Sequence, residues 1–143
     1  MPDDASLCRL VYVSQPLATP YGVILDIARA SERRNTAFGL SGMLHYDPTA
    51  YAQYVEGPAD GLAEVWRSIA ADRRHAVVWH RLESAESRRI STGLPMGYTN
   101  GDRLRRHLRA KGPGALWTPD QSEALTDALV DIGHAIYPVA AAV

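Results

Sequence analysis

The order of hydrophobic patterns in the first 82 residues limits the possible folds more than any other feature of this sequence. Strand-like alternation and helical periodicity take turns along it, at 7–14, 20–34, 38–46, 51–56, 58–71 and 76–82. The resulting order of strand, helix, strand, strand, helix and strand is the split βαβ arrangement, also called ferredoxin-like. It predicts an α+β fold with the first and third strands as central neighbours and both helices on one face of the sheet.

The inner stripe of the first predicted helix changes character along its length. Its members recur at helical spacing: Ile24, Ile27, Ala28, Ser31 and Asn35. A stripe that packs into an apolar core would stay apolar, whereas this one becomes polar at its C-terminal end. In the predicted fold, Tyr12 of the first strand and Gln53 of the third strand point into the same layer. The sequence therefore gathers Tyr12, Gln53 and Asn35 around one polar region.

Two polar features of this region allow more than one interpretation. A buried glutamine is costly unless its amide groups find partners, so Gln53 indicates a polar network or a polar ligand. The simpler interpretation is a glutamine that faces solvent or pairs across the sheet. The charged run at 72–75 either stabilises the C-terminal dipole of the second helix or binds a ligand between the two helices.

Composition and missing motifs argue against several classes of protein. Fifteen Lys and Arg against sixteen Asp and Glu give a net charge of −1, which argues against a nucleic-acid partner. Cys8 is the only cysteine, so no internal disulfide can form. The five histidines follow no recognisable metal-binding spacing, and no nucleophile elbow or phosphate-binding loop occurs. Without a signal peptide or an apolar run of roughly 18 residues, we expect a cytoplasmic protein with no membrane association.

The composition changes near residue 99. A short basic helix is expected at 102–111 and a longer helix at 119–137, and the apolar stripe of the longer one is Leu125, Leu129, Ile132 and Ile136. This stripe suits packing on the sheet or on a second subunit. We therefore divide the chain into a domain at 1–98 and a C-terminal helical extension at 99–143. A further short extended segment near 87–91 is a candidate fifth strand.

Several stretches, in order and at matching spacing, make residues 7–96 resemble a BLUF domain, a blue-light sensor that binds FAD non-covalently. These stretches are Arg9-Leu-Val-Tyr12-Val-Ser14, Asn35-Thr-Ala-Phe-Gly39-Leu-Ser-Gly42-Met-Leu-His-Tyr46, Gln53-Tyr-Val-Glu56-Gly57-Pro58, Asp72-Arg-Arg-His75 and Met96. The resemblance implies a short stand-alone photoreceptor rather than an enzyme. The flavin ring would lie between the two helices, and the residues implied to bind it are Tyr12, Ile24, Ile27, Ser31, Asn35, Gln53, Ile69, Asp72, Arg74 and His75.

The resemblance also implies a photochemical mechanism. Tyr12 would give an electron and a proton to the excited flavin, and Gln53 would bridge Tyr12 and the flavin. Rotation or tautomerisation of the Gln53 amide would rewire its hydrogen bonds and shift the absorption to the red. Met96 would lie beside this glutamine. The switch would then alter a protein–protein contact, so we expect a homo-oligomer and an unidentified downstream protein partner.

Two residues depart from the family pattern. Leu94 stands where many relatives have a tryptophan two residues before the methionine, so an exchange of that tryptophan with the methionine cannot operate in its usual form. Arg34 stands where relatives often have asparagine or histidine. The alternative hypothesis is a ferredoxin-like enzyme that binds a small ligand or an anion, because the fold alone does not determine activity. In that case Arg74, His75 and Asn35 would hold the anion.

Overall fold

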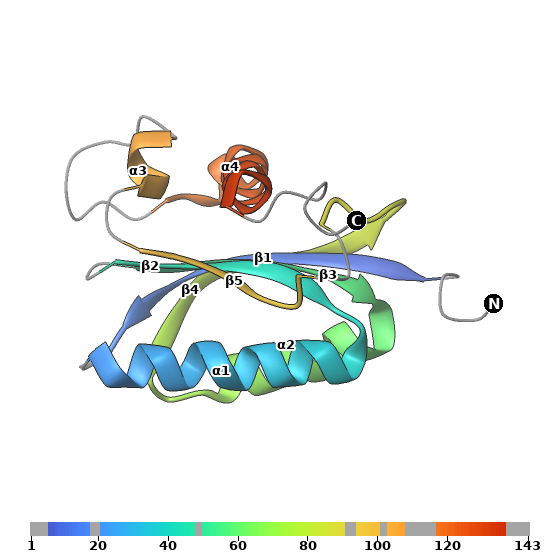
Figure 1. The fold of residues 1–143 in the computed structure, drawn as a ribbon, viewed down its shortest axis with the longest axis horizontal. Helices are drawn as coiled ribbons and strands as arrows, with labels where there is room; N and C mark the ends of the chain where they lie inside the picture. The colour runs from blue at the N-terminus through green and yellow to red at the C-terminus, as the bar shows by residue number, and fades with distance from the viewer. Residues whose placement is uncertain are drawn as a thin grey trace.

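The computed structural model describes residues 6–17, 21–47, 50–90, 94–100, 103–107 and 117–136, without the side chains of 21–25, 47, 103, 107 and 136. The elements are β1 (Leu7–Pro16), α1 (Tyr21–Phe38), β2 (Ser41–Asp47), β3 (Ala50–Pro58), α2 (Ala59–Ala71), β4 (His75–Ala85), β5 (Gly97–Asn100), α3 (Arg103–His107), η2 (Pro119–Gln121) and α4 (Ser122–Ile136). Figure 1 shows three layers, with α1 and α2 on one face of the sheet and α3 and α4 on the other.

The sheet confirms the predicted ferredoxin-like arrangement. Its strand order is β4-β1-β3-β2-β5, and β1 pairs with β3 and β4 in antiparallel register. The central pair aligns Tyr12 with Gln53 directly across β1 and β3. Because directly opposed residues share a face of the sheet, both side chains belong to the layer that α1 and α2 cover.

The first helix ends four residues later than predicted, because its end is set by the chain that follows. Gly39 adopts a φ of +70°, and its N–H donates to the carbonyl of Thr36 at 3.3 Å. The N–H of Leu40 donates to the carbonyl of Asn35 at 2.8 Å. These two bonds form a Schellman motif, which ends a helix on a left-handed glycine. Asn35 therefore lies inside α1, and the following strand begins only at Ser41.

The fifth strand does not lie where the sequence predicted it. Residues 87–90 of the expected segment form bends and irregular chain instead of a strand, and β5 is Gly97–Asn100, paired in parallel with β2. The physical reason lies on β3. The carboxylate of Glu56 accepts the backbone N–H groups of Arg89 and Ile90, both at 2.8 Å. Those N–H groups are thereby engaged by a side chain instead of a neighbouring strand.

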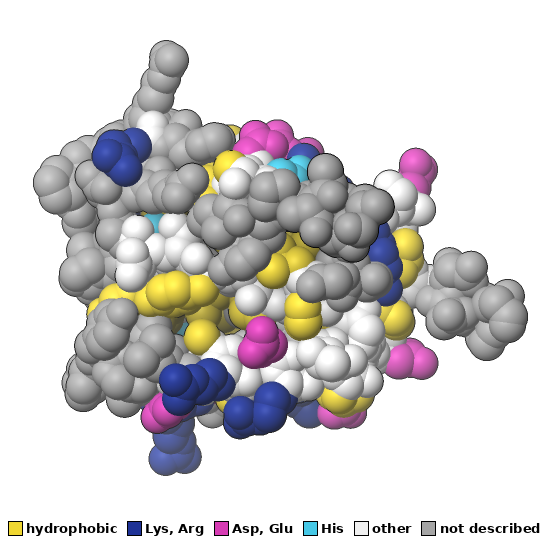
Figure 2. Space-filling view, in the orientation of Figure 1, with side chains coloured by type: hydrophobic (Ala, Val, Ile, Leu, Met, Phe, Trp, Pro, Cys, Tyr) yellow, Lys and Arg dark blue, Asp and Glu magenta, His cyan; other side chains and the backbone are white. Residues whose placement is uncertain are grey.

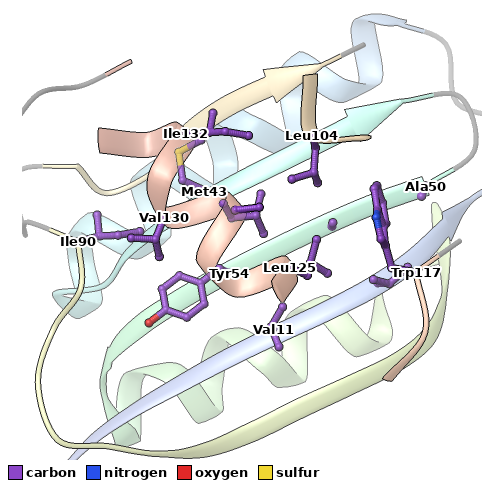
Figure 3. Packing of buried hydrophobic residues seen from close by; sticks show 14 residues of the cluster. Val11, Met43, Ala50, Tyr54, Ile90, Leu104, Trp117, Leu125, Val130 and Ile132 are labelled. Atoms are coloured by element: carbon purple, nitrogen blue, oxygen red, sulfur yellow. The ribbon is translucent and has the colours of Figure 1, made fainter. Parts of the chain in front are cut away.

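Two hydrophobic clusters lie on opposite faces of the sheet, and β1 contributes to both. Leu10 and Tyr12 belong to the cluster under α1 and α2, whereas Val11 and Val13 belong to the cluster under α4. Figure 3 shows α4 side chains pointing toward Met43 and Tyr54 of the sheet. The last helix therefore packs on the sheet, which decides between the two packing arrangements that its stripe allowed.

The outward face of α1 is polar. Figure 2 shows arginine or lysine side chains gathered over the α1 side of the molecule, and the exposed residues of this helix include Arg29 and Arg33. The opposite face of the helix is therefore the one available to close a site against the sheet. Among the described residues, no helix combines the length and apolar character that crossing a membrane requires.

Candidate functional site

A cavity that is partly open to solvent lies between the two helices and the sheet. Of the residues that line this cavity, three belong to β1 and β3 and several to the inward face of α1. The others belong to β2, to α2 and to the chain that follows α2. The lining consists of Tyr12, Ile27, Ala30, Ser31, Arg34, Leu44, Tyr51, Gln53, Ser68, Ile69, Asp72, Arg74 and His75. The first helix turns its mixed stripe toward this space, which accounts for the polar residues in that stripe.

Tyr12 and Gln53 form a hydrogen-bonded pair in the wall of the cavity. The Tyr12 hydroxyl donates to Gln53 Oε1 at 2.5 Å, and the two residues are 4% and 2% exposed. Burial raises the pKa of the Tyr12 phenol, so the phenol keeps its proton and acts as the donor. The other end of the Gln53 amide donates from Nε2 to Met96 Sδ at 3.7 Å. Because a thioether is a weak acceptor, this end of a buried amide is poorly satisfied.

Asn35 is fully buried near the C-terminal end of α1. Its amide nitrogen donates to the carbonyl of Pro95 at 2.8 Å, which ties α1 to the segment before β5. Its Oδ1 atom is also buried and has no hydrogen-bond partner within the described residues. A buried acceptor without a donor carries a desolvation cost of roughly 1–3 kcal/mol. This open acceptor indicates an incomplete polar network.

The charged run after α2 caps the end of that helix and also lines the cavity. The Arg74 guanidinium donates to both carboxylate oxygens of Asp72, from Nη2 to Oδ2 at 2.6 Å and from Nε to Oδ1 at 2.9 Å, and these bonds lower the pKa of the Asp72 carboxyl. His75 Nε2 lies 2.7 Å from the carbonyl of Ile69, and its Nδ1 lies 2.7 Å from Ser14 Oγ. A carbonyl only accepts, so Nε2 carries a proton and caps the end of α2. The side chains of Asp72, Arg74 and His75 also line the cavity.

Arg34 is a cavity residue that sequence reasoning left out of the predicted site. Its Nη1 donates to Ser68 Oγ at 3.1 Å, and this bond links α1 to α2. Burial lowers the pKa of the guanidinium, and its Nε is buried without a partner in the described part of the chain. Three-residue spacing from Ser31 was the available signal, since it places Arg34 on the same helix face.

The remaining predicted site residues divide into three groups. Ile27, Ser31 and Ile69 line the cavity, with the two isoleucines on different helices. Asn35 and Met96 are outside the lining: Met96 accepts a hydrogen bond from the lining residue Gln53, and Asn35 donates to the carbonyl of Pro95, the residue before Met96. The side chain of Ile24 lies outside the described residues. Tyr51 is a lining residue that was missed, although its position two residues before Gln53 on the same strand face could have indicated it.

Comparisons with known proteins agree with this geometry. The family model described as "BLUF: Sensors of blue-light using FAD" matches residues 7–97. The dark-state structure of BlrB, a BLUF protein, is 28% identical, with a TM-score of 0.64 and complete coverage of both chains. The photo-activated BlsA structure is 20% identical, with a TM-score of 0.71 over 87% of this chain and 94% of that one, and supports the fold alone.

One curated relative is a much larger protein. Photoactivated adenylate cyclase subunit beta of Euglena longa is 33% identical over 76 residues, which make up 52% of this chain. The matched part spans only 9% of that protein, so the likeness concerns a sensor-sized segment and not the whole relative. Because the family model matches the chain from β1 to the start of β5, this chain belongs to the BLUF family of flavin-based blue-light sensors.

Proposed function

We propose that this chain binds FAD non-covalently in the cavity between α1 and α2, and that Tyr12, Gln53 and Met96 form its light switch. The observation that carries the proposal is the buried hydrogen bond between Tyr12 and Gln53 in the cavity wall. It supports a switch because a phenol, which can lose an electron and a proton, is joined to an amide with a donor end and an acceptor end.

The side chains around the cavity suit the chemistry of a flavin ring. Such a ring presents carbonyl acceptors, a ring N–H donor and two flat apolar faces. The open Oδ1 of Asn35 can accept an N–H, while Arg34 Nε and Gln53 Nε2 can donate to carbonyls. Ile27 and Ile69 supply apolar contacts from the two helices. Asp72, Arg74, His75 and Ser31 add polar groups to the rest of the wall, so the set of residues fits the group.

The protein side of the light reaction follows from the Tyr12–Gln53 hydrogen bond. A bound flavin supplies a blue-light-absorbing ring whose excited state is a strong oxidant. Loss of an electron makes the Tyr12 phenol a strong acid, and Gln53 Oε1 is the acceptor in line for its proton. Protonation at Oε1 or rotation of the amide changes what Gln53 Nε2 offers to its surroundings, including Met96. The switch therefore needs only small movements of heavy atoms.

We also propose that residues 1–98 act as the sensor domain and 99–143 as the helical extension that passes on the signal, with β5 shared between them. The support is a set of contacts from the segment before β5 to α4. Arg89 pairs with Asp127 at 2.8 Å, and its carbonyl contacts His134 Nε2 at 2.9 Å. The output is then a changed protein contact in a homo-oligomer or with a downstream partner. The chain itself performs no enzymatic step.

The nature of the flavin is part of the proposal. FAD is favoured because the family description names it, whereas one matched structure, BlrP1 with FMN and cyclic diGMP, contains FMN. Release of the cofactor by heat and its mass measurement would separate FAD, FMN and riboflavin. The alternative hypothesis of an anion-binding enzyme has no support from the family match.

An absorption spectrum of the purified protein, recorded in the dark and after blue light, tests the function. The expected result is a flavin spectrum with a small red shift that reverses in the dark. A flavin spectrum that does not shift would contradict the switch while leaving the binding site in place. A colourless protein that also fails to bind added FAD would contradict the proposed function as a whole.

A further inference from the structure

We propose that Trp66 is a second redox-active side chain of the light reaction, which returns an electron to Tyr12 after Tyr12 has been oxidised. The residues that the resemblance places around the flavin do not include Trp66, which packs on the hydrophobic cluster that contains Tyr12. The inference rests on the proposed function, because it needs a bound flavin to oxidise Tyr12.

Three rings lead from the buried phenol to the surface. The centroids of the Tyr12 and Trp66 rings are 5.9 Å apart, with a tilt of 51° between the planes. Trp66 in turn stacks on His80 of β4, with centroids 4.3 Å apart and planes 28° apart. Tyr12 is buried, Trp66 is half-buried and His80 is exposed. Aromatic rings at these separations are in contact, so an electron has a short path between Tyr12 and solvent.

The chemistry of the neighbours of Tyr12 favours Trp66 as the electron donor. An indole is far easier to oxidise than an imidazole or an aliphatic side chain. His75 also lies edge-on to Tyr12, at 6.0 Å between centroids, but both of its nitrogens already have hydrogen-bond partners and its ring is a poor donor. Because Trp66 is only half-buried, its oxidised form is partly solvated and can lose a proton to water.

The step balances as a one-electron transfer. Trp66 loses one electron, and Tyr12 gains that electron and takes back the proton that it had given to Gln53. The oxidised indole releases its N–H proton to water. An external enediol reductant such as ascorbate then returns one electron and one proton to Trp66 and is itself oxidised. The net result is that light moves one electron from the reductant to the flavin.

A second tryptophan provides a matched control. Trp79 lies next to His80 on β4, but it is aligned with Val13 and packs under α4 on the other face of the sheet. Its Nε1 donates to the carbonyl of Trp117 at 2.9 Å. The same substitution at this position removes an indole that is also half-buried, without changing the path from Tyr12 to the surface.

The experiment compares the flavin-loaded wild type with Trp66→Phe, Trp79→Phe and Tyr12→Phe. After a blue flash, transient absorption should show a tryptophan radical in the wild type and in Trp79→Phe, but not in Trp66→Phe. Under steady blue light with ascorbate and without oxygen, reduced flavin should accumulate severalfold more slowly in Trp66→Phe than in the wild type or in Trp79→Phe. The reversible red shift, measured without ascorbate, should persist in both tryptophan variants.

Each contrary outcome has a distinct meaning. A wild type without a tryptophan radical, or a Trp66→Phe variant that matches it in both measurements, would overturn the inference. A Trp66 radical that forms in Tyr12→Phe would also overturn it, because Trp66 would then donate directly and not through Tyr12. Failure of the wild type to bind any flavin would instead contradict the proposed function.

Discussion

Two buried polar side chains on β3, the carboxylate of Glu56 and the amide of Gln53, lie on opposite faces of the sheet and differ in how fully they are hydrogen-bonded. Glu56 points to the α4 side and accepts three hydrogen bonds, from the Tyr54 hydroxyl at 2.6 Å and from two backbone N–H groups. Gln53 points to the cavity side and has one strong partner, Tyr12, and one weak partner, the sulfur of Met96. Complete hydrogen bonding makes Glu56 a structural clamp, whereas incomplete hydrogen bonding leaves Gln53 able to rearrange.

The same difference extends to the residues around them. On the α4 side, Leu125 and Leu129 are fully buried, and α4 approaches so closely at Gly133 that an added Cβ would lie 3.0 Å from Met43 Cγ. On the cavity side, Asn35 and Arg34 keep polar atoms that lack partners among the described residues. The close packing around α4 stabilises the fold, and the space under α1 and α2 is the one suited to a ligand.

The largest expected effect is on the switch. Gln53→Leu should abolish the light-induced red shift while the flavin remains bound, because leucine fills the space but cannot exchange a donor for an acceptor. Glu56→Gln is the control, since it changes a polar side chain on the same strand but should keep the red shift. Dark and light absorption spectra of both variants provide the measurement. A full red shift in Gln53→Leu would contradict the assignment of the switch.

The next effect is on stability and concerns the clamp. Glu56→Gln should lower the free energy of unfolding by about 1.5–3 kcal/mol. The amide NH₂ of the variant would face a group that now donates a hydrogen bond to the carboxylate, so two donors would meet and that bond would be lost. Denaturant titration of the wild type and the variant provides the value. An unchanged midpoint would show that the three hydrogen bonds of Glu56 contribute little, and the contrast drawn between the two faces would lose its energetic basis.

A smaller effect is expected at Arg34. Arg34→Gln should weaken flavin binding about tenfold, or about 1.4 kcal/mol, since a half-buried cation with an open N–H faces the cavity. Arg67→Gln is the matched control, because Arg67 lies on α2 with an exposed side chain that pairs with Glu64. Titration of the apoprotein with FAD measures both. Equal affinities for the two variants would exclude Arg34 from the binding site.

The smallest expected effect is a pH dependence at Asp72. The hydrogen bonds from Arg74 lower the pKa of Asp72 from its usual 3.8, so the folded state favours the charged carboxylate. The stabilisation is complete above pH 3.8 and is lost as the pH falls through the lower pKa of the folded state. Because the pair is partly exposed, we expect less than about 1 kcal/mol. Unfolding curves of the wild type and Asp72→Asn should converge in acid, and parallel curves would exclude this contribution.

The sequence was sufficient to predict the features that depend on periodicity and order. Alternation within 7–14 and 51–56, with the split βαβ order, was enough to place Tyr12 beside Gln53 before any coordinates. The helical stripe was also enough to indicate that Ile27 and Ser31 share a face. These predictions succeeded because neighbouring residues and standard connections decide them.

Features that depend on distant parts of the chain were not predicted. The end of α1 is set by Gly39 and the chain beyond it, and the bends at 87–90 are held by Glu56 from another strand. The stripe of α4 showed that one side is buried but not what buries it. For the same reason the sequence alone does not place Arg34 in the site, since its link to Ser68 exists only once α1 and α2 pack together.

The parallel pairing of β5 with β2 gives this molecule a place to open without unfolding. The strand has four residues and, in the described part of the sheet, hydrogen-bonds to a neighbour on one side only. Few backbone bonds must break for it to detach, so its local opening should cost much less than global unfolding. Its amides should therefore exchange with deuterium faster than those of β1 or β3. Since Met96 directly precedes this strand, the hydrogen bond from Gln53 Nε2 to Met96 Sδ joins the cavity wall to the part of the sheet that should open most easily.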